Sequence, residues 1–177
     1  MATNKILIAG FGGQGILFAG KALANTGLGE NMEVSWLPSY GPEMRGGTAN
    51  CSITLSSEPI GSPIVDKPNI LVAMNLPSYE KHYKDTEIGG YVIFDSSLIE
   101  PSERKDGVTT VGVPATKLAS DNGLDGFANM IMLGKVLKET KIFTLEQFKD
   151  SLTRNIPAKK ADLLAKNIKA IELGYNY

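Results

Sequence analysis

Short apolar runs that alternate with helix-like segments most constrain what this chain can fold into. Lys5–Ala9 leads through a glycine-rich turn into a helix-like stretch, Ile16–Thr26, and the same strand-then-helix order returns later in the chain. A run that is apolar at every position is typical of a parallel strand buried on both faces. The alternation predicts an α/β fold, a three-layer α/β/α domain with a mostly parallel central sheet, with residues 1–177 as a single domain.

Turn residues and hydrophobic period set the other expected boundaries. Pro38 is expected to close the second strand, and residues 48–56 alternate between apolar and polar side chains, which predicts a strand with one apolar face. The further strands are expected at residues 32–37, 48–56, 70–74, 91–94 and 108–113. The further helices are expected at residues 77–83, 116–120, 128–138, 144–153 and 158–173.

Composition excludes several classes of protein. Lys plus Arg is 18 and Asp plus Glu is 19, so no overall field favours nucleic acid or anionic lipid as a partner. No apolar run approaches the ~18 residues of a membrane span. The single cysteine, Cys51, excludes a disulfide framework and any cysteine-held zinc site or iron–sulfur cluster in this chain alone. The single histidine, His82, leaves little for a histidine-based metal site or a Ser-His-Asp triad. We expect a cytoplasmic protein without catalytic residues or metal ligands of its own.

Charge is distributed unevenly along the chain. Residues 1–134 carry 9 basic and 14 acidic groups, whereas residues 135–177 carry 9 and 5. The basic segment fits either a solvated helix face or a face for an anionic partner.

The glycine-rich turn is the first candidate site. Gly10, Gly12 and Gly15 fit the pattern G-x-G-x-x-G between a strand and a helix, where backbone N–H groups can meet an anion. The dinucleotide fingerprint also needs an acid at the end of the next strand, and that strand ends Ser-Trp-Leu-Pro. The lysine of a phosphate-binding Walker loop is missing too. An anion site and a plain tight turn both remain open.

The segment from Ser39 to Gly47 is the second candidate site. Gly-Pro and Gly-Gly pairs flank Glu43, Met44 and Arg45. Arg45 can hold a carboxylate or phosphate through two hydrogen bonds, which favours a binding or docking loop over a surface ion pair.

These two segments, together with Gly61-Ser62-Pro63 and Ala73-Met74-Asn75, resemble the gamma subunit of 2-oxoacid:ferredoxin oxidoreductases. The similarity is densest from Lys5 to Phe94, and the 2-oxoglutarate and branched-chain 2-oxoacid (ketoisovalerate) types are the most similar. The motif at residues 36–51 is far more specific than the glycine turn.

The resemblance implies an accessory subunit of a complex that oxidatively decarboxylates a 2-oxoacid to acyl-coenzyme A, CO2 and reduced ferredoxin. It implies that thiamine diphosphate, Mg and iron–sulfur clusters lie in other chains, so that this chain holds no cofactor alone. The expected partners are alpha and beta subunits, a ferredoxin-like delta subunit in some complexes, and ferredoxin as electron acceptor. The fold would be like the gamma domain of pyruvate:ferredoxin oxidoreductase, which closes over coenzyme A. The isolated chain could also pair with itself through its docking face.

The resemblance and the two candidate segments define one expected binding region. The residues expected to meet coenzyme A or a facing subunit are Gly10, Gly12, Gly13, Gln14, Gly15, Ser39, Tyr40, Glu43, Met44, Arg45, Gly46 and Asn75.

Four other residues are interpreted structurally or left open. Asn75 and Asp95 end strands and could border the same crevice, although such residues often cap helices. Cys51 is expected to pack rather than react, and His82 is expected to be solvated.

Two alternative functions remain. The first is the beta-type subunit of indolepyruvate:ferredoxin oxidoreductase, which performs the same chemistry on an aryl substrate. The second is a free-standing nucleotide-binding module, which predicts tight nucleotide binding by the isolated chain.

Overall fold

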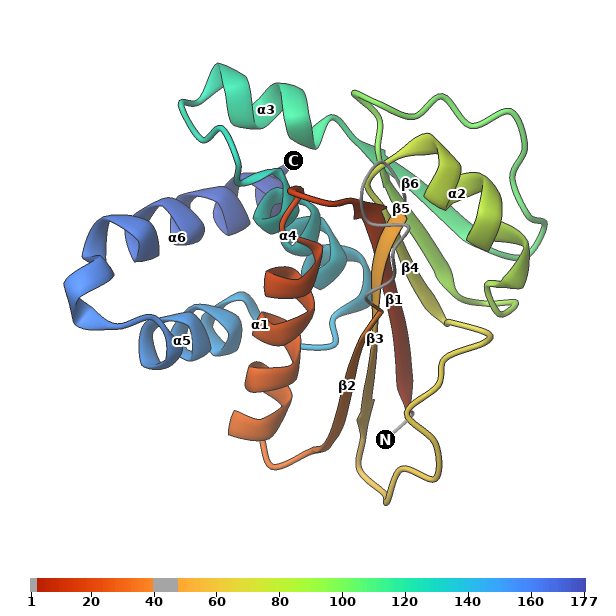
Figure 1. Cartoon of the computed structure of the whole chain (residues 1–177), viewed down its shortest axis with the longest axis horizontal. Coiled ribbons are helices and arrows are strands. Elements are labelled where there is room, and N and C mark those ends of the chain that lie inside the picture. The colour runs from red at the N-terminus through yellow and green to blue at the C-terminus, as the bar shows by residue number, and fades with distance from the viewer. Residues whose placement is uncertain (1–2, 40–47) are drawn as a thin grey trace.

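The computed structural model describes residues 3–39 and 48–177, and these form a six-stranded sheet with helices on its two faces (Figure 1). The strands are β1 (Asn4–Phe11), β2 (Glu33–Ser39), β3 (Thr48–Ser56), β4 (Ile70–Ala73), β5 (Tyr91–Asp95) and β6 (Thr109–Val113). The helices are α1 (Ile16–Gly29), α2 (Leu76–His82), α3 (Ala115–Asp121), α4 (Ala128–Thr140), α5 (Leu145–Asn155) and α6 (Ala161–Asn176), with 3-10 turns η2 (Tyr83–Asp85) and η3 (Ala158–Lys160).

The sheet is mostly parallel, as the sequence predicts. The strand order is β2-β3-β1-β4-β5-β6. Neighbours from β1 to β6 pair in parallel, whereas β3 runs antiparallel to both β1 and β2. Because β3 is the only reversed strand of the described sheet, the carboxyl end of β2 and the amino end of β3 lie at the same edge as the carboxyl ends of the parallel strands.

Side chains alternate between two cores on the faces of the sheet. Ile6 and Ile8 of β1 belong to the larger core with α1 and α4, and α5 and α6 lie outside these two helices (Figure 1). Leu7 faces the smaller core, which Tyr79 of α2 helps to close. This alternation is why buried strands in the sequence read as unbroken apolar runs.

Helices α4 and α6 pack backbone against backbone. A Cβ on Gly174 would lie 1.8 Å from the carbonyl oxygen of Ile131, and a Cβ on Gly134 would lie 2.1 Å from that of Ile171. Neither position can carry a side chain unless the helices separate.

Three local expectations are corrected by the structure. Strand β2 does not close at Pro38 but continues to Ser39, because an edge strand tolerates a proline that an interior strand would not. The helix expected from residue 158 starts as the η3 turn, and α6 begins at Ala161. Thr144 with Gln147 forms the capping box of α5, so that helix starts one residue later than expected. In the part of the chain described, no helix is both long and apolar enough to cross a membrane.

Candidate functional site

The glycine-rich turn joins the carboxyl end of β1 to the amino end of α1. Gly13 and Gly15 have φ angles of +90° and +73°, in the left-handed region that residues with a Cβ avoid. Gly15 is the N-cap of α1, and a Cβ there would also lie 2.4 Å from Nδ2 of Asn129. The backbone path therefore requires glycine at both positions.

Gln14 fastens this turn to the neighbouring strand. The Phe11 N–H donates to Oε1 of Gln14 at 2.6 Å, and Nε2 of Gln14 donates to the Met74 carbonyl at 2.9 Å. Met74 directly follows β4, so one amide holds the ends of two parallel strands together. Gly10 leaves the space for it, because a Cβ there would lie 2.5 Å from that Oε1. The side chain of Gln14 thus orders the turn and leaves the backbone to meet a ligand.

The turn presents backbone donors that the described residues do not use. Within residues 3–39 and 48–177, no acceptor binds the N–H groups of Gly12, Gly13 or Gly15, or those of residues 16–18 in the first turn of α1. Gly12 and Gly13 are exposed, and the first turn of α1 has no acidic residue. The partial positive charge at the start of this 14-residue helix adds to the attraction. The arrangement can bind an anion such as a phosphate.

The strand register shows where the residues on either side of the second candidate segment lie. Thr48 of β3 pairs with Phe11 at the glycine turn, and Ser39 of β2 pairs with Asn50 of β3, one strand further from the turn. Ser39 is exposed there. The other predicted residues of this segment, Tyr40, Glu43, Met44, Arg45 and Gly46, lie outside the described residues.

The side chains of Asn75 and Asp95 both accept hydrogen bonds from N–H groups at the start of a helix. Oδ1 of Asn75 accepts from the Ser78 N–H at 2.9 Å and caps α2. Asp95 is fully buried, and its carboxylate accepts from Ser97 N–H at 3.0 Å and from the N–H and hydroxyl of Thr116 at 3.1 and 2.5 Å. The carboxylate of Asp95 is thereby used within the scaffold.

The structure agrees with the sequence-based expectation for Cys51 but not with that for His82. Cys51 packs as expected: it is fully buried, its thiol donates to the Ile16 carbonyl at 3.5 Å, and burial raises its pKa to about 12. The expectation of a solvated His82 is wrong. Its Nε2 is enclosed with no hydrogen-bond partner among the described residues, and burial lowers its pKa, aided by Lys81 and opposed by Asp85. His82 lines a hollow together with Leu7 of β1 and Asn50 and Ser52 of β3, a position that the flanking lysines did not indicate.

Sequence reasoning missed Asn129, which supports the site from α4. Its Nδ2 donates to the Gly15 carbonyl at 3.0 Å, and its Oδ1 accepts from the Met130 N–H at 2.9 Å. Asn129 therefore fixes the end of the glycine turn from a position 114 residues away in sequence. No local pattern could have shown this contact.

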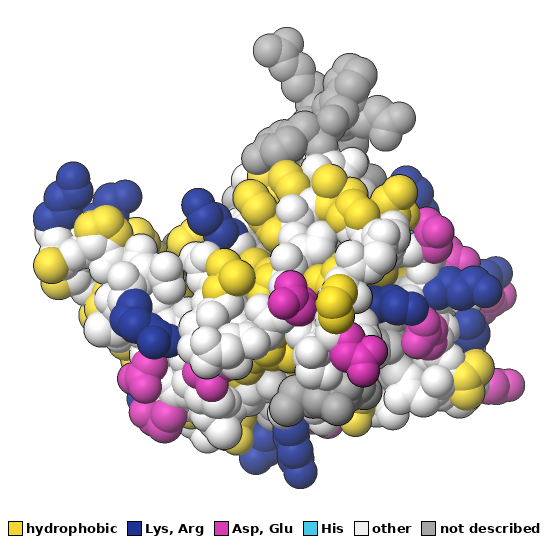
Figure 2. All heavy atoms as spheres, turned by 90° about the horizontal axis from the view of Figure 1, so that it is seen from below, with side chains coloured by type: hydrophobic (Ala, Val, Ile, Leu, Met, Phe, Trp, Pro, Cys, Tyr) yellow, Lys and Arg dark blue, Asp and Glu magenta, His cyan; other side chains and the backbone are white. Residues whose placement is uncertain are grey.

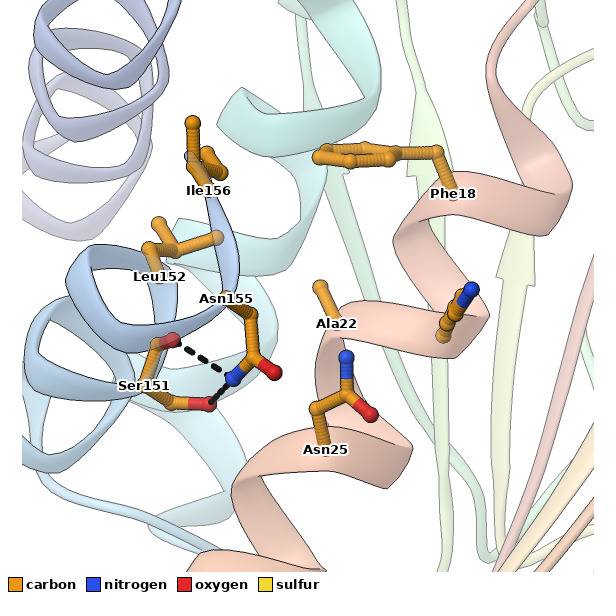
Figure 3. A pocket seen from close by; sticks show the side chains of 8 residues that line it. Phe18, Ala22, Asn25, Ser151, Leu152, Asn155 and Ile156 are labelled. Atoms are coloured by element: carbon orange, nitrogen blue, oxygen red, sulfur yellow. Dashed lines mark hydrogen bonds between the residues drawn. The ribbon is translucent and has the colours of Figure 1, made fainter. Parts of the chain in front are cut away.

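Two apolar hollows flank Phe18, and these too were not predicted. One, of about 150 Å³, lies between α1 and α5 and is lined mainly by Phe18, Ala22, Leu152 and Ile156 (Figure 3). The other, of about 230 Å³, also contains Phe18 and reaches Gly15. The sequence feature that could have indicated these hollows is Phe18, a large apolar residue on the same exposed face of α1 as Lys21.

Comparison with known proteins agrees with this architecture. Residues 5–177 match the pyruvate ferredoxin/flavodoxin oxidoreductase family. The chain belongs to this family. It is 39% identical over 175 residues to the ketoisovalerate oxidoreductase subunit VorA of Methanothermobacter marburgensis, covering 98% of this chain and 36% of the relative. It is 36% identical over 175 residues to the 2-oxoglutarate synthase subunit KorC of Methanocaldococcus jannaschii, covering 97% of this chain and 92% of the relative.

Family members thus carry this unit in two forms. The chain spans about a third of the length of the ketoisovalerate relatives but nearly the whole of KorC. An indolepyruvate oxidoreductase subunit of Thermococcus kodakarensis is less similar, at 24% identity over 196 residues, 98% of this chain and 95% of the relative.

A solved structure shows the same fold. The 2-oxoglutarate:ferredoxin oxidoreductase of Magnetococcus marinus, determined with 2-oxoglutarate, coenzyme A and succinyl-CoA bound, matches with a TM-score of 0.88 at 26% identity. The match covers 99% of this chain and 31% of that chain.

Proposed function

We propose that residues 1–177 form one gamma-type domain that serves as an accessory subunit of a 2-oxoacid:ferredoxin oxidoreductase. The whole complex would convert a 2-oxoacid and coenzyme A to acyl-CoA and CO2 and pass the electrons to ferredoxin. The similarity to ketoisovalerate and 2-oxoglutarate subunits supports this over the indolepyruvate alternative. The proposal locates the complex in the cytoplasm, where a lone thiol such as Cys51 stays reduced.

Within this proposal, the chain assists the chemistry by binding coenzyme A. The observation that carries it is the group of unused N–H donors of residues 12, 13 and 15–18. Arg45 lies three residues before Thr48 in the sequence, and Thr48 pairs with Phe11 at the glycine turn. Backbone N–H groups and arginine guanidinium groups both bind phosphates well, so the proposal assigns both to coenzyme A.

The other cofactors of such complexes do not fit this chain. Iron–sulfur clusters need several thiolates, whereas Cys51 is the only cysteine and burial holds its thiol protonated. Thiamine diphosphate, Mg and the clusters are therefore proposed for the alpha and beta subunits and a ferredoxin-like delta subunit. The task left to this chain is to orient coenzyme A and to exclude water from the acyl-transfer step.

The test uses the assembled complex rather than the isolated chain. We expect Arg45→Ala to raise the Michaelis constant for coenzyme A about 10-fold or more, because one charge-assisted contact to phosphate is lost. The Michaelis constant for the 2-oxoacid should stay unchanged. Arg104→Ala, at an exposed arginine far along the chain, is the control. An intact complex whose coenzyme A constant is unchanged in Arg45→Ala would exclude Arg45 as a phosphate ligand. Tight nucleotide binding by the isolated chain, without any partner subunit, would support the free-standing module instead.

A further inference from the structure

We propose that the two hollows beside Phe18 form a docking groove for an acidic, amphipathic segment of a partner subunit. This proposal depends on the proposed function for one point only, namely that the partner is a catalytic subunit of the same oxidoreductase. The groove itself is defined by Phe18 and Ala22 of α1, Leu152 of α5, Ile156 directly after α5, and Leu163 of α6.

The floor of the groove is apolar and its shape suits large side chains. Phe18 is 41% exposed and Leu163 is 37% exposed, although both are large apolar residues. In Figure 3 the Phe18 ring extends from α1 toward the side of α5 that carries Ile156. A hollow of about 150 Å³ is the size that holds one aromatic ring. Two hollows that share Phe18 can take two apolar anchors from one amphipathic helix.

Two of the four polar side chains that line the first hollow are hydrogen-bonded to each other. Nδ2 of Asn155 donates to the Ser151 carbonyl at 2.7 Å and lies 3.4 Å from the Ser151 hydroxyl (Figure 3). Apolar groups can therefore cover the α5 wall and leave that amide donor hydrogen-bonded, whereas Asn25 and Lys21 on the α1 wall are left to meet polar groups of the partner.

The rim of the groove selects the charge of the partner. Lys21 lines the first hollow, and Lys159, Lys160 and Lys166 lie on the η3–α6 side, Lys159 and Lys160 within four residues of Ile156. Basic side chains gather at the end of the molecule where α5 meets α6 (Figure 2). None of these four lysines forms an ion pair with an acid of the described chain, and Asp150 and Asp162 are the only acids between residues 147 and 171. A partner with carboxylates around its apolar anchors is the complement of this rim.

The family comparison favours contacts between this unit and other subunits. The same unit is part of a chain about three times as long in the ketoisovalerate relatives, and it makes up almost the whole chain in KorC. A unit that is not covalently joined to the rest of its enzyme has to be held by surface contacts. The second hollow reaches Gly15, so a partner seated here would also border the glycine turn.

The first test is a photocrosslink from Lys21→Cys. Cys51 is buried with a pKa of about 12, so a benzophenone maleimide labels the introduced cysteine alone. In the assembled complex we expect crosslinks to an acidic, amphipathic segment of the alpha or beta subunit. Lys67→Cys, at an exposed position outside the groove, is the control and should not reach that segment. Crosslinks only to a second copy of this chain would overturn the proposal, as would none at all in an intact complex.

The second test measures affinity for the purified alpha and beta subunits. We expect Lys159→Glu/Lys160→Glu to weaken binding about 10-fold or more at low salt, and Phe18→Ala to weaken it at every salt concentration. Lys67→Glu/Lys81→Glu reverses the same number of charges elsewhere and should bind like wild type. Because Lys159 and Lys160 are exposed, their substitution should leave the melting temperature unchanged.

The two proposals fail in distinguishable ways. A wild-type chain that forms no complex with these subunits would overturn both. A wild-type complex in which the groove variants bind like the control variants would overturn the docking groove and leave the proposed function standing.

Discussion

Two helix pairs on the same face of the sheet are packed in opposite ways. Between α4 and α6, Gly134 and Gly174 let one backbone touch the other, with no space for a single methyl group. Between α1 and α5, Phe18 and Ala22 leave a hollow of about 150 Å³ open to solvent. The contact between α4 and α6 has the close packing that is typical of protein interiors. The contact between α1 and α5 lies in the same layer but leaves apolar surface uncovered.

The largest expected effect is at the tight pair. Gly174→Ala places a methyl group against the Ile131 carbonyl, which is backbone and cannot move aside, so we expect a loss of about 3 kcal/mol or more in the free energy of unfolding. Urea unfolding followed by circular dichroism measures it. Gly61→Ala is the control, since a Cβ at Gly61 meets nothing within 4 Å. Equal stability of the two variants would show that α4 and α6 can separate at little cost.

The opposite result is expected at the open pair. Ala22→Leu adds apolar carbons toward the hollow, and we expect a gain of about 1 kcal/mol in stability together with weaker binding of the partner. Ala19→Leu is the matched control in the same helix, because Ala19, unlike Ala22, lines neither hollow, and a larger side chain there should destabilise. If both variants lose stability alike, the hollow does not accept a side chain.

The reactivity of Cys51 measures how firmly α1 is held against the sheet. The thiol contacts the Ile16 carbonyl of α1, so reagents reach it only when α1 leaves the sheet. With a pKa of about 12, only about one thiol in ten thousand is ionised at pH 8. We expect slow labelling by Ellman's reagent in the native protein, slower still in Ala22→Leu, and complete labelling in denaturant. Fast labelling of the native wild type would mean that α1 is held even more loosely than the hollow indicates.

The smallest effect concerns the other face of the sheet, where His82 is half-buried and its Nε2 has no hydrogen-bond partner among the described residues. Because burial lowers its pKa, the folded state binds fewer protons than the unfolded state once the pH falls below the ordinary value of about 6.5. Stability should therefore fall as the pH falls through this range, and His82→Gln should reduce that dependence. Proton NMR of the only histidine measures the pKa directly. A pKa at or above 6.5 would contradict the burial of this ring.

The sequence predicts much of the fold because buried parallel strands are apolar at every position. The runs around Ile6, Val72 and Ile93 each became a strand close to its expected limits. The sequence did not show that β3 is reversed between β1 and β2, because an alternating pattern fits either direction.

The candidate site was predictable only in its local part. The glycine turn follows from its own spacing, since Gly13 and Gly15 need left-handed backbone. The contacts of Gln14 with Met74 and of Asn129 with Gly15 span 60 and 114 residues, and no local period encodes them. The hollow beside Phe18 depends on how far α5 stands from α1, which is decided by packing across the whole layer.

Pro38 has a further consequence, which concerns solubility. It lies in β2, the edge strand of the sheet, and the exposed Glu33 begins the same strand. An open edge invites extended segments of other chains to add themselves, which is the first step of aggregation. A proline and a charge on that strand both oppose such growth, so this edge resists polymerisation.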